Sequence, residues 1–265
     1  MTPFDPLHWP RRKETQRKMS LLFLGIRHGK QLWRNLKPGP GYGSKSSHMR
    51  LQRNIFPSIG VIFVHIPKTA GTSLHSYFSQ LSDAYGATPR LPELEPYARE
   101  IAYKHKMACE LKAWIGDELW SRAFKVAFVR NPWDLMVSSY NWWLQKAPTY
   151  PHFGAQVEQV QALGSFKSFL ASDFGTRMIN EVTGSMEDWF QDSGRDIVDY
   201  VGKVETIDAD LRAIRDLAGL SDGGILLEQL NPTKREGYRS YYDDESREMI
   251  RRRFAYIIDR FGYRF

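Results

Sequence analysis

The chain has 265 residues, of which 42% are hydrophobic and 25% are charged, and its formal net charge is +7. This length allows one substantial hydrophobic core, and no run approaches the roughly 18 apolar residues that a membrane-spanning helix needs. A single cysteine, Cys109, excludes an intrachain disulfide and fits a reducing compartment, so we expect a soluble, cytoplasmic protein.

Positive charge is concentrated at the start of the chain. Residues 1–54 contain 12 basic residues against two acidic ones, whereas the rest of the chain has 25 basic and 28 acidic residues. A Gly-, Pro- and Ser-rich segment at residues 37–48 is typical of a linker. We therefore predict a basic N-terminal arm with its linker over residues 1–53 and an enzyme domain over residues 54–265. Such an arm is suited to peripheral contact with a membrane surface or an acidic polymer, with a solubilising tail as the alternative, and no specific nucleic-acid partner is predicted.

The first predicted elements are a buried strand over residues 61–66, a tight loop over residues 67–73, and an amphipathic helix. The helix is indicated by apolar residues at helical spacing, namely Leu74, Tyr77, Phe78 and Leu81. A loop of this kind directs unpaired backbone N–H groups and the positive end of a helix dipole at one point. Lys68 adds a full charge, and three hydroxyl donors follow it: Thr69, Thr72 and Ser73. The pattern predicts a loop that binds a phosphate-like anion.

Further along the chain, predicted strands and helices alternate. They are a helix over residues 107–120, a strand over 125–130, a helix over 133–144, an irregular aromatic region over 145–190, a strand over 197–205, a helix carrying Ile207, Leu211, Ile214 and Leu217 on one face, and a closing helix over 243–262. This alternation predicts an α/β fold with a mainly parallel sheet, whose ligands lie at the carboxyl ends of the strands.

A second group of polar residues follows the strand predicted at residues 125–130. Arg130 ends that strand, Asn131 is suited to a helix N-cap, and Pro132 is suited to the first helical turn. Ser138 lies about two turns into the helix. An arginine offers a charge-assisted, bidentate contact to a phosphate and a serine offers a directional donor, so these two residues predict a second phosphate site.

The string HIPKTAGTS at residues 65–73, followed about 60 residues later by Arg130 and Ser138, resembles the cofactor motifs of sulfotransferases that use 3′-phosphoadenosine 5′-phosphosulfate (PAPS). It is most similar to carbohydrate sulfotransferases of the heparan sulfate 2-O type and their bacterial relatives. The resemblance implies a P-loop-like, three-layer α/β fold with a central, mainly parallel sheet flanked by helices. A nucleotide-hydrolase P-loop would read GxxxxGK[ST], whereas Lys68 here comes three residues before Gly71.

The resemblance also implies which part of the donor each residue binds. The donor would be PAPS, the product adenosine 3′,5′-bisphosphate, and no metal ion is expected. The 5′-phosphosulfate would be held by the loop residues Pro67, Lys68, Thr69, Ala70, Gly71, Thr72 and Ser73. The ribose 3′-phosphate would be held by Arg130 and Ser138. In the C-terminal loop, Thr233, Lys234 and Arg235 are candidates for the 3′-phosphate or the adenine, with a solvated basic turn as the alternative.

The catalytic residues are predicted in the same way. Lys68 would neutralise the oxygen that bridges phosphorus and sulfur as that bond breaks. His105, which precedes a predicted helix, resembles the family's general base, and His152 is the second candidate. His65 is expected to pack against the loop.

The acceptor is predicted to be a carbohydrate hydroxyl, because flat aromatic rings suit sugar faces. The candidates for contact with it are Tyr150, His152 and Phe153, whereas Trp133, Tyr140 and Leu144 are expected to face the core. Nothing in the sequence selects one sugar, or excludes another alcohol as acceptor. Two other classes of function stay open: a nucleotide-dependent kinase on the same fold, and a non-catalytic protein that binds an acidic polymer through its basic arm.

Overall fold

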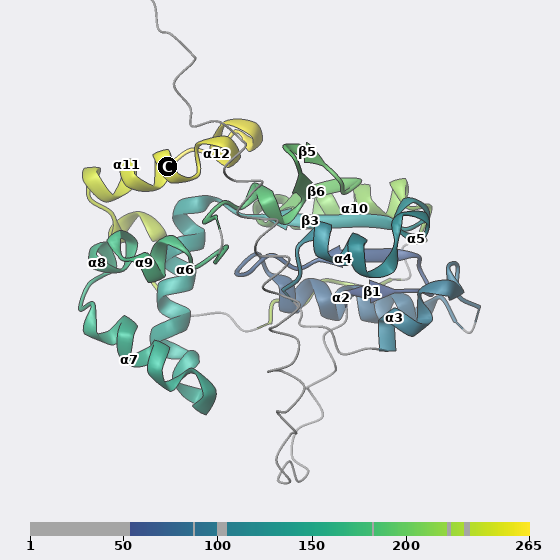
Figure 1. Ribbon diagram of the computed structural model, residues 1–265, viewed down its shortest axis with the longest axis horizontal. Coiled ribbons are helices and arrows are strands. Elements are labelled where there is room, and N and C mark those ends of the chain that lie inside the picture. The colour runs from purple at the N-terminus through teal and green to yellow at the C-terminus, as the bar shows by residue number, and fades with distance from the viewer. Residues whose placement is uncertain (1–53, 87, 100–104, 182, 222–223, 231–233) are drawn as a thin grey trace, which may run out of the picture. The chain divides into compact units, whose positions relative to one another are not determined.

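The structure is a computed structural model, and it describes residues 54–265 except residues 87, 100–104, 182, 222–223 and 231–233 (Figure 1). The predicted N-terminal arm and linker, residues 1–53, lie outside the described residues.

The centre of the described chain is a four-stranded sheet with the strand order β1-β2-β3-β6. Its strands are β1 (Ile55–Phe56), β2 (Val61–Val64), β3 (Phe124–Val129) and β6 (Tyr200–Lys203). β1 pairs antiparallel with β2, whereas β2, β3 and β6 are parallel, with Val64 opposite Ala127 and Phe128 opposite Gly202. The predicted α/β fold with a mainly parallel sheet is therefore confirmed.

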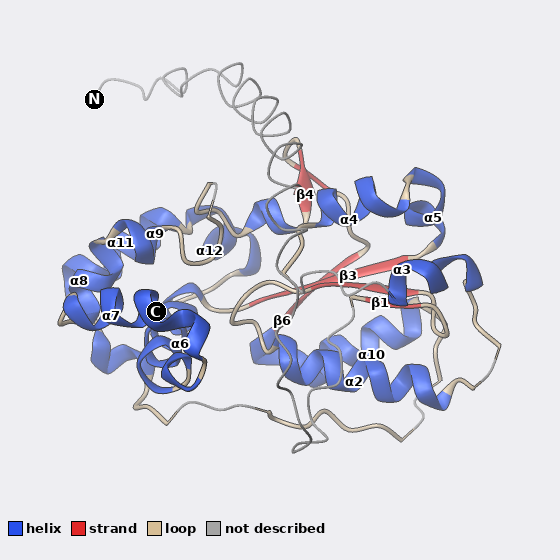
Figure 2. Cartoon of the chain, turned by 60° about the horizontal axis from the view of Figure 1, so that its bottom comes forward, coloured by secondary structure: helices blue, strands red, loops and turns tan. Residues whose placement is uncertain are grey.

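Both faces of the sheet are covered by helices, which makes three layers (Figure 2). Alternate strand residues point to opposite faces. Val61, Phe63, Val126 and Phe128 pack with the buried residues of α2 (Gly71–Ala84) and α10 (Ile207–Leu217). Ile62, Val64, Ala127 and Val129 pack with α3 (Glu95–Arg99), α4 (Ala108–Ile115) and α5 (Asp117–Arg122). This two-sided burial explains why β2 and β3 are almost continuously apolar.

The helix α6 (Pro132–Gln145) leaves the carboxyl end of β3 and leads into a second group of helices (Figure 1). This group contains α7 (Gly154–Ala162), α8 (Phe166–Ala171), α9 (Asp173–Thr176), α11 (Asp244–Arg253) and α12 (Ala255–Phe261), and a small ribbon of β4 (Gln191–Asp192) and β5 (Arg195–Asp196) follows α9. The predicted inward positions on α6 are only partly buried: Trp133 is buried, whereas Tyr140 and Leu144 are half-buried. Tyr140 packs against the rings of Phe166 and Phe169.

Several predicted boundaries were wrong. The single helix predicted over residues 107–120 is broken at Gly116, whose φ of 89° is incompatible with a continuing helix. The predicted closing helix is likewise two helices, separated at Phe254. The region 145–190 was predicted to be irregular but contains α7, α8 and α9. Leu217, placed on the buried face of α10, is 63% exposed because the helix ends there.

Candidate active site

The loop between β2 and α2 has an unusual backbone. Lys68 and Ala70 adopt left-handed conformations, with φ of 66° and 60°, and the only other non-glycine residue of the described chain that does so is Ser193. Turns that contain left-handed residues can direct successive backbone N–H groups toward one side, which is the geometry of concave anion-binding nests. Ala70 is also the N-cap of the 14-residue helix α2, whose first turn adds further unpaired N–H groups. Backbone strain of this kind persists only where the packing of the surrounding residues enforces it.

Gly71 allows the loop to close against His65. A Cβ atom at Gly71 would lie 1.6 Å from Nε2 and 2.0 Å from Cδ2 of His65. The His65 ring is 5% exposed and stacks on Phe63, with 5.4 Å between ring centroids. His65 therefore packs under the first turn of α2, as expected from the sequence.

Replacement of Gly71 by alanine is expected to disrupt this packing, because the enclosed His65 ring has to move to admit a methyl group. We expect a loss of about 1–3 kcal/mol in the free energy of unfolding, together with weaker nucleotide binding. Thermal unfolding and calorimetry measure the two effects. Gly154→Ala is the matched control, since a Cβ at that helical glycine meets nothing within 4 Å. Equal unfolding temperatures for the two variants would contradict the packing argument.

Two of the three loop hydroxyls are used within the protein. Thr69 Oγ1 donates to the carbonyl of Ile66 at 3.0 Å, and Ser73 Oγ accepts from the backbone N–H of Leu230 at 2.8 Å. Thr69 is fully buried, so its contribution to anion binding would come from its backbone N–H. Thr72 is half-buried in the first turn of α2. The Thr69 hydroxyl is therefore engaged within the loop, and its contact with an anion stays a prediction.

Arg130 lies directly beside the loop. Its Nη1 donates to the carbonyl of Lys68 at 3.1 Å, which connects the segments that follow the neighbouring strands β2 and β3. Its Nε and Nη2 contact Oδ2 of Asp134 at 2.7 and 2.6 Å. Asn131 is the N-cap of α6, with its side chain accepting from the N–H groups of Trp133 and Asp134. Ser138 lies one turn beyond Asp134 and is 7% exposed.

His105 contacts the other end of the same loop. Its Nδ1 lies 2.9 Å from the carbonyl oxygen of His65, and the two imidazole rings are 4.4 Å apart. A carbonyl oxygen can only accept, so Nδ1 carries the hydrogen, and Nε2 is the acceptor nitrogen of the neutral ring. The ring is nearly perpendicular to that of Trp189, with 6.3 Å between the ring centroids.

The aromatic residues predicted for the acceptor are connected to the loop through Trp142. Lys68 Nζ lies over the Trp142 ring, 5.1 Å from its centroid, and Tyr150 stacks near that ring at 6.3 Å. Phe153 packs edge-on to Trp142, and His152 packs on Phe153 at 4.1 Å. Tyr150 and His152 are exposed. The sequence did not assign a role to Trp142, which lies about three turns beyond Asn131 on α6.

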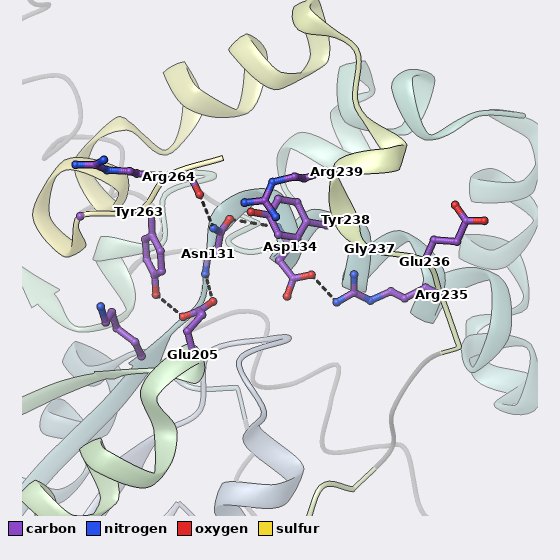
Figure 3. Close-up of a pocket in the computed structure, with 12 residues that line it drawn as sticks. Asn131, Asp134, Glu205, Arg235, Glu236, Gly237, Tyr238, Arg239, Tyr263 and Arg264 are labelled. Carbon is purple, nitrogen blue, oxygen red and sulfur yellow. Dashed lines mark hydrogen bonds and ion pairs between the residues drawn. The ribbon is translucent and has the colours of Figure 1, made fainter.

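A pocket of about 670 Å³ lies next to this site (Figure 3). Among its lining residues are Asn131, Asp134, Glu205, Arg235 and Tyr263. Glu205 accepts from the backbone N–H of Asn131 at 2.7 Å and from the Tyr263 hydroxyl at 3.0 Å. Burial, and then the Glu205 carboxylate, raise the pKa of Tyr263 well above its ordinary value, so this phenol stays protonated and donates.

Of the C-terminal candidates Thr233, Lys234 and Arg235, the one that contacts Asp134 is Arg235. Arg235 Nη2 pairs with Oδ1 of Asp134 at 2.5 Å. Lys234 is exposed, and its carbonyl accepts from Gln145 Nε2 at 2.8 Å. Thr233 lies outside the described residues. Sequence reasoning missed Asp134, although its spacing of four residues from Arg130 is a known signal of a helical ion pair.

The described residues contain no group of three or more His, Cys, Asp or Glu side chains arranged to hold a metal ion. No helix within them is long and apolar enough to cross a membrane.

Comparison with known proteins agrees with this architecture. A model of the sulfotransferase family matches residues 52–264, which include the loop, Arg130, His105 and the C-terminal loop. Neither the curated proteins nor the solved structures contain a match to the chain. Since the family model covers most of the chain, and the fold has the central parallel sheet flanked by helices that the family requires, the protein belongs to the sulfotransferase family and is a sulfuryl transferase.

Proposed function

We propose that the protein transfers the sulfuryl group of PAPS to a hydroxyl of a carbohydrate acceptor. The observation that carries this proposal is the double anchoring of one loop: the carbonyl of Lys68 bonds Arg130, and the carbonyl of His65 bonds His105. Arg130 is 62 residues from Lys68, and His105 is 40 residues from His65. Residues that are distant in the chain are thereby brought to the two ends of one loop. Sulfotransferases in general use PAPS as donor, and the residues present here fit such a ligand.

The two ends of a bisphosphorylated nucleotide would meet different residues. The nest at Lys68 to Ala70 and the N-terminus of α2 are suited to the 5′-phosphosulfate. Arg130 and Ser138 lie on the α6 side of the loop and are suited to the 3′-phosphate. When bound, PAPS supplies the reacting sulfur: the acceptor oxygen bonds to it as the bond to the 5′-phosphate oxygen breaks, releasing adenosine 3′,5′-bisphosphate.

His105 and Lys68 would provide the proton acceptor and the charge. The hydrogen bond from Nδ1 of His105 to His65 orients the imidazole so that Nε2 can take the proton of the acceptor hydroxyl. The Lys68 ammonium, held over the Trp142 ring, would stabilise the negative charge that develops on the departing phosphate.

A carbohydrate acceptor is supported by the exposed aromatic surface next to Lys68. Trp142, Tyr150, His152 and Phe153 form one continuous set of ring contacts, and Lys68 lies against its first member. Flat rings of this kind pack against the C–H faces of sugars. The ring contacts that connect this surface to Lys68 support the proposal, because the acceptor would then lie beside the charge that would assist transfer.

Calorimetry with adenosine 3′,5′-bisphosphate tests the donor. We expect saturable binding in the presence of a chelator, and labelled sulfate should pass from PAPS to members of a panel of oligosaccharides. ATP binding that requires Mg²⁺, with no binding of the bisphosphate, would instead support the kinase alternative. A chain lacking residues 1–53 should keep its nucleotide binding, whereas a binder of acidic polymers would lose its ligand.

A further inference from the structure

The carboxylate of Asp134 forms ion pairs with two arginines from distant parts of the chain. Oδ2 receives Nε and Nη2 of Arg130 at 2.7 and 2.6 Å, and Oδ1 receives Nη2 of Arg235 at 2.5 Å. Arg130 directly follows β3, whereas Arg235 belongs to the segment that precedes Tyr238–Tyr241, about 100 residues later. The carboxylate thus ties the C-terminal segment to the first turn of α6 (Figure 3).

This ion-pair group is unusually enclosed. The side chains of Arg130, Asp134 and Arg235 are 17%, 19% and 15% exposed. In the other ion pairs between described residues, at least one partner is about a third exposed or more. Two guanidinium groups at this depth would repel each other without a shared counter-ion, and an enclosed charge left without its partner is strongly unfavourable. The Asp134 carboxylate therefore allows the two guanidinium groups to lie close to each other.

The same geometry leaves donors available. Of the five N–H groups of a guanidinium, Arg130 directs one from Nε and one from Nη2 to Asp134, and one from Nη1 to the carbonyl of Lys68. Arg235 uses Nη2 on Asp134. The remaining N–H groups of the two arginines lie in the planes that these contacts fix. Ser138 follows Asp134 by one turn on the same face of α6. The group has a net charge of +1, so it keeps its attraction for an anion.

We propose that Asp134 is a positioning residue that aligns Arg130 and Arg235 as a paired receptor for the 3′-phosphate of the nucleotide. The proposal rests on the proposed function, since it concerns the ligand of that site. Asp134 itself does not touch the ligand. Its effect is transmitted through the two guanidinium planes.

The experiment compares two nucleotides that differ only in the 3′-phosphate: adenosine 3′,5′-bisphosphate and adenosine 5′-monophosphate. Asp134→Asn keeps the shape of the side chain but removes its charge and one acceptor oxygen. We expect it to weaken binding of the bisphosphate by about tenfold or more, with little change for the monophosphate. In turnover, KM for PAPS should rise more than kcat falls, because the chemical step depends on other residues.

Three further variants separate positioning from general stability. Asp134→Glu restores the charge and should recover most of the bisphosphate affinity. Arg235→Gln should weaken bisphosphate binding by itself, and adding Asp134→Asn to it should have less effect than in the wild type, because one of the two aligned groups is already gone. Asp196→Asn is the matched control, since Arg260 binds both oxygens of Asp196 away from this site, and it should leave the ratio of the two affinities unchanged.

The outcomes distinguish this proposal from the function on which it rests. Wild-type protein that binds the bisphosphate, with Asp134→Asn binding it equally well or more tightly, would overturn the positioning role alone. Equal losses for both nucleotides would overturn it too, since they would indicate a general structural effect. A wild-type chain that binds neither nucleotide would overturn the proposed function and the positioning role together.

Discussion

Replacement of His105 by alanine is expected to lower kcat by about a hundred- to ten-thousand-fold, the usual contribution of a general base. Binding of adenosine 3′,5′-bisphosphate should change by less than about threefold, because a general base acts in the chemical step. Single-turnover transfer of labelled sulfate, with donor and acceptor both saturating, measures the chemical step. Calorimetry on the same preparation measures the binding.

His152→Ala provides the comparison for this variant, since His152 was the second candidate for the base. His152 is exposed and packs on Phe153, within the aromatic surface proposed for the acceptor. We expect its loss to raise KM for the acceptor while kcat falls much less than in His105→Ala. Near-normal kcat in His105→Ala, combined with a large fall in His152→Ala, would move the role of base to His152.

Replacement of Lys68 by methionine is expected to lower kcat by about a hundred- to a thousand-fold, comparable to the removal of one preorganised donor from a developing anion. Methionine keeps the length and apolar part of the side chain, so contact with Trp142 can persist without the charge. Methionine, like lysine, has an unbranched side chain, so the left-handed backbone at this position is about equally strained with either residue. The fall in kcat therefore measures the contribution of the ammonium group to the chemical step.

Lys167→Met is the control for this charge removal. Lys167 is an exposed lysine that pairs with Asp243 and Glu245, and we expect normal turnover when it is replaced. Lys68→Arg should recover part of the activity, since the charge is restored with a different shape. A Lys68→Met enzyme with unchanged kcat in single-turnover measurements would show that the leaving phosphate does not depend on this lysine.

Local patterns predicted the part of the site that is continuous in the chain. The apolar run before Pro67 and the spacing of Leu74, Tyr77 and Phe78 correctly predicted β2, the loop and α2, because burial on one face determines each of these elements. Asn131 was correctly predicted as the N-cap of α6, since an Asn before a Pro satisfies the first N–H groups of a helix. The left-handed backbone at Lys68 and Ala70 was not predicted, as neither residue type favours it.

Errors arose where a continuous apolar pattern spans a break in the backbone. The stripe that runs across Gly116 and the one that runs across Phe254 each suggested one helix, and each belongs to two. Helical periodicity reports which residues are buried, and two short helices packed on one surface can bury the same set. Only the packing of the second helix against the core decides where the first one ends.

The sequence by itself determined the fold class, the strand–loop–helix unit at residues 61–84 and the family, because these depend on residues that are neighbours in the chain and on burial patterns of short period. The tertiary structure decided which side chains face one another. Sheet order placed Arg130 against the carbonyl of Lys68, and the return of the C-terminal segment brought Arg235 to Asp134 across about 100 residues. Such contacts have no local periodicity, since they are set by the packing of whole elements, and for that reason the pairing of Arg235 with Asp134 became visible only in the folded protein.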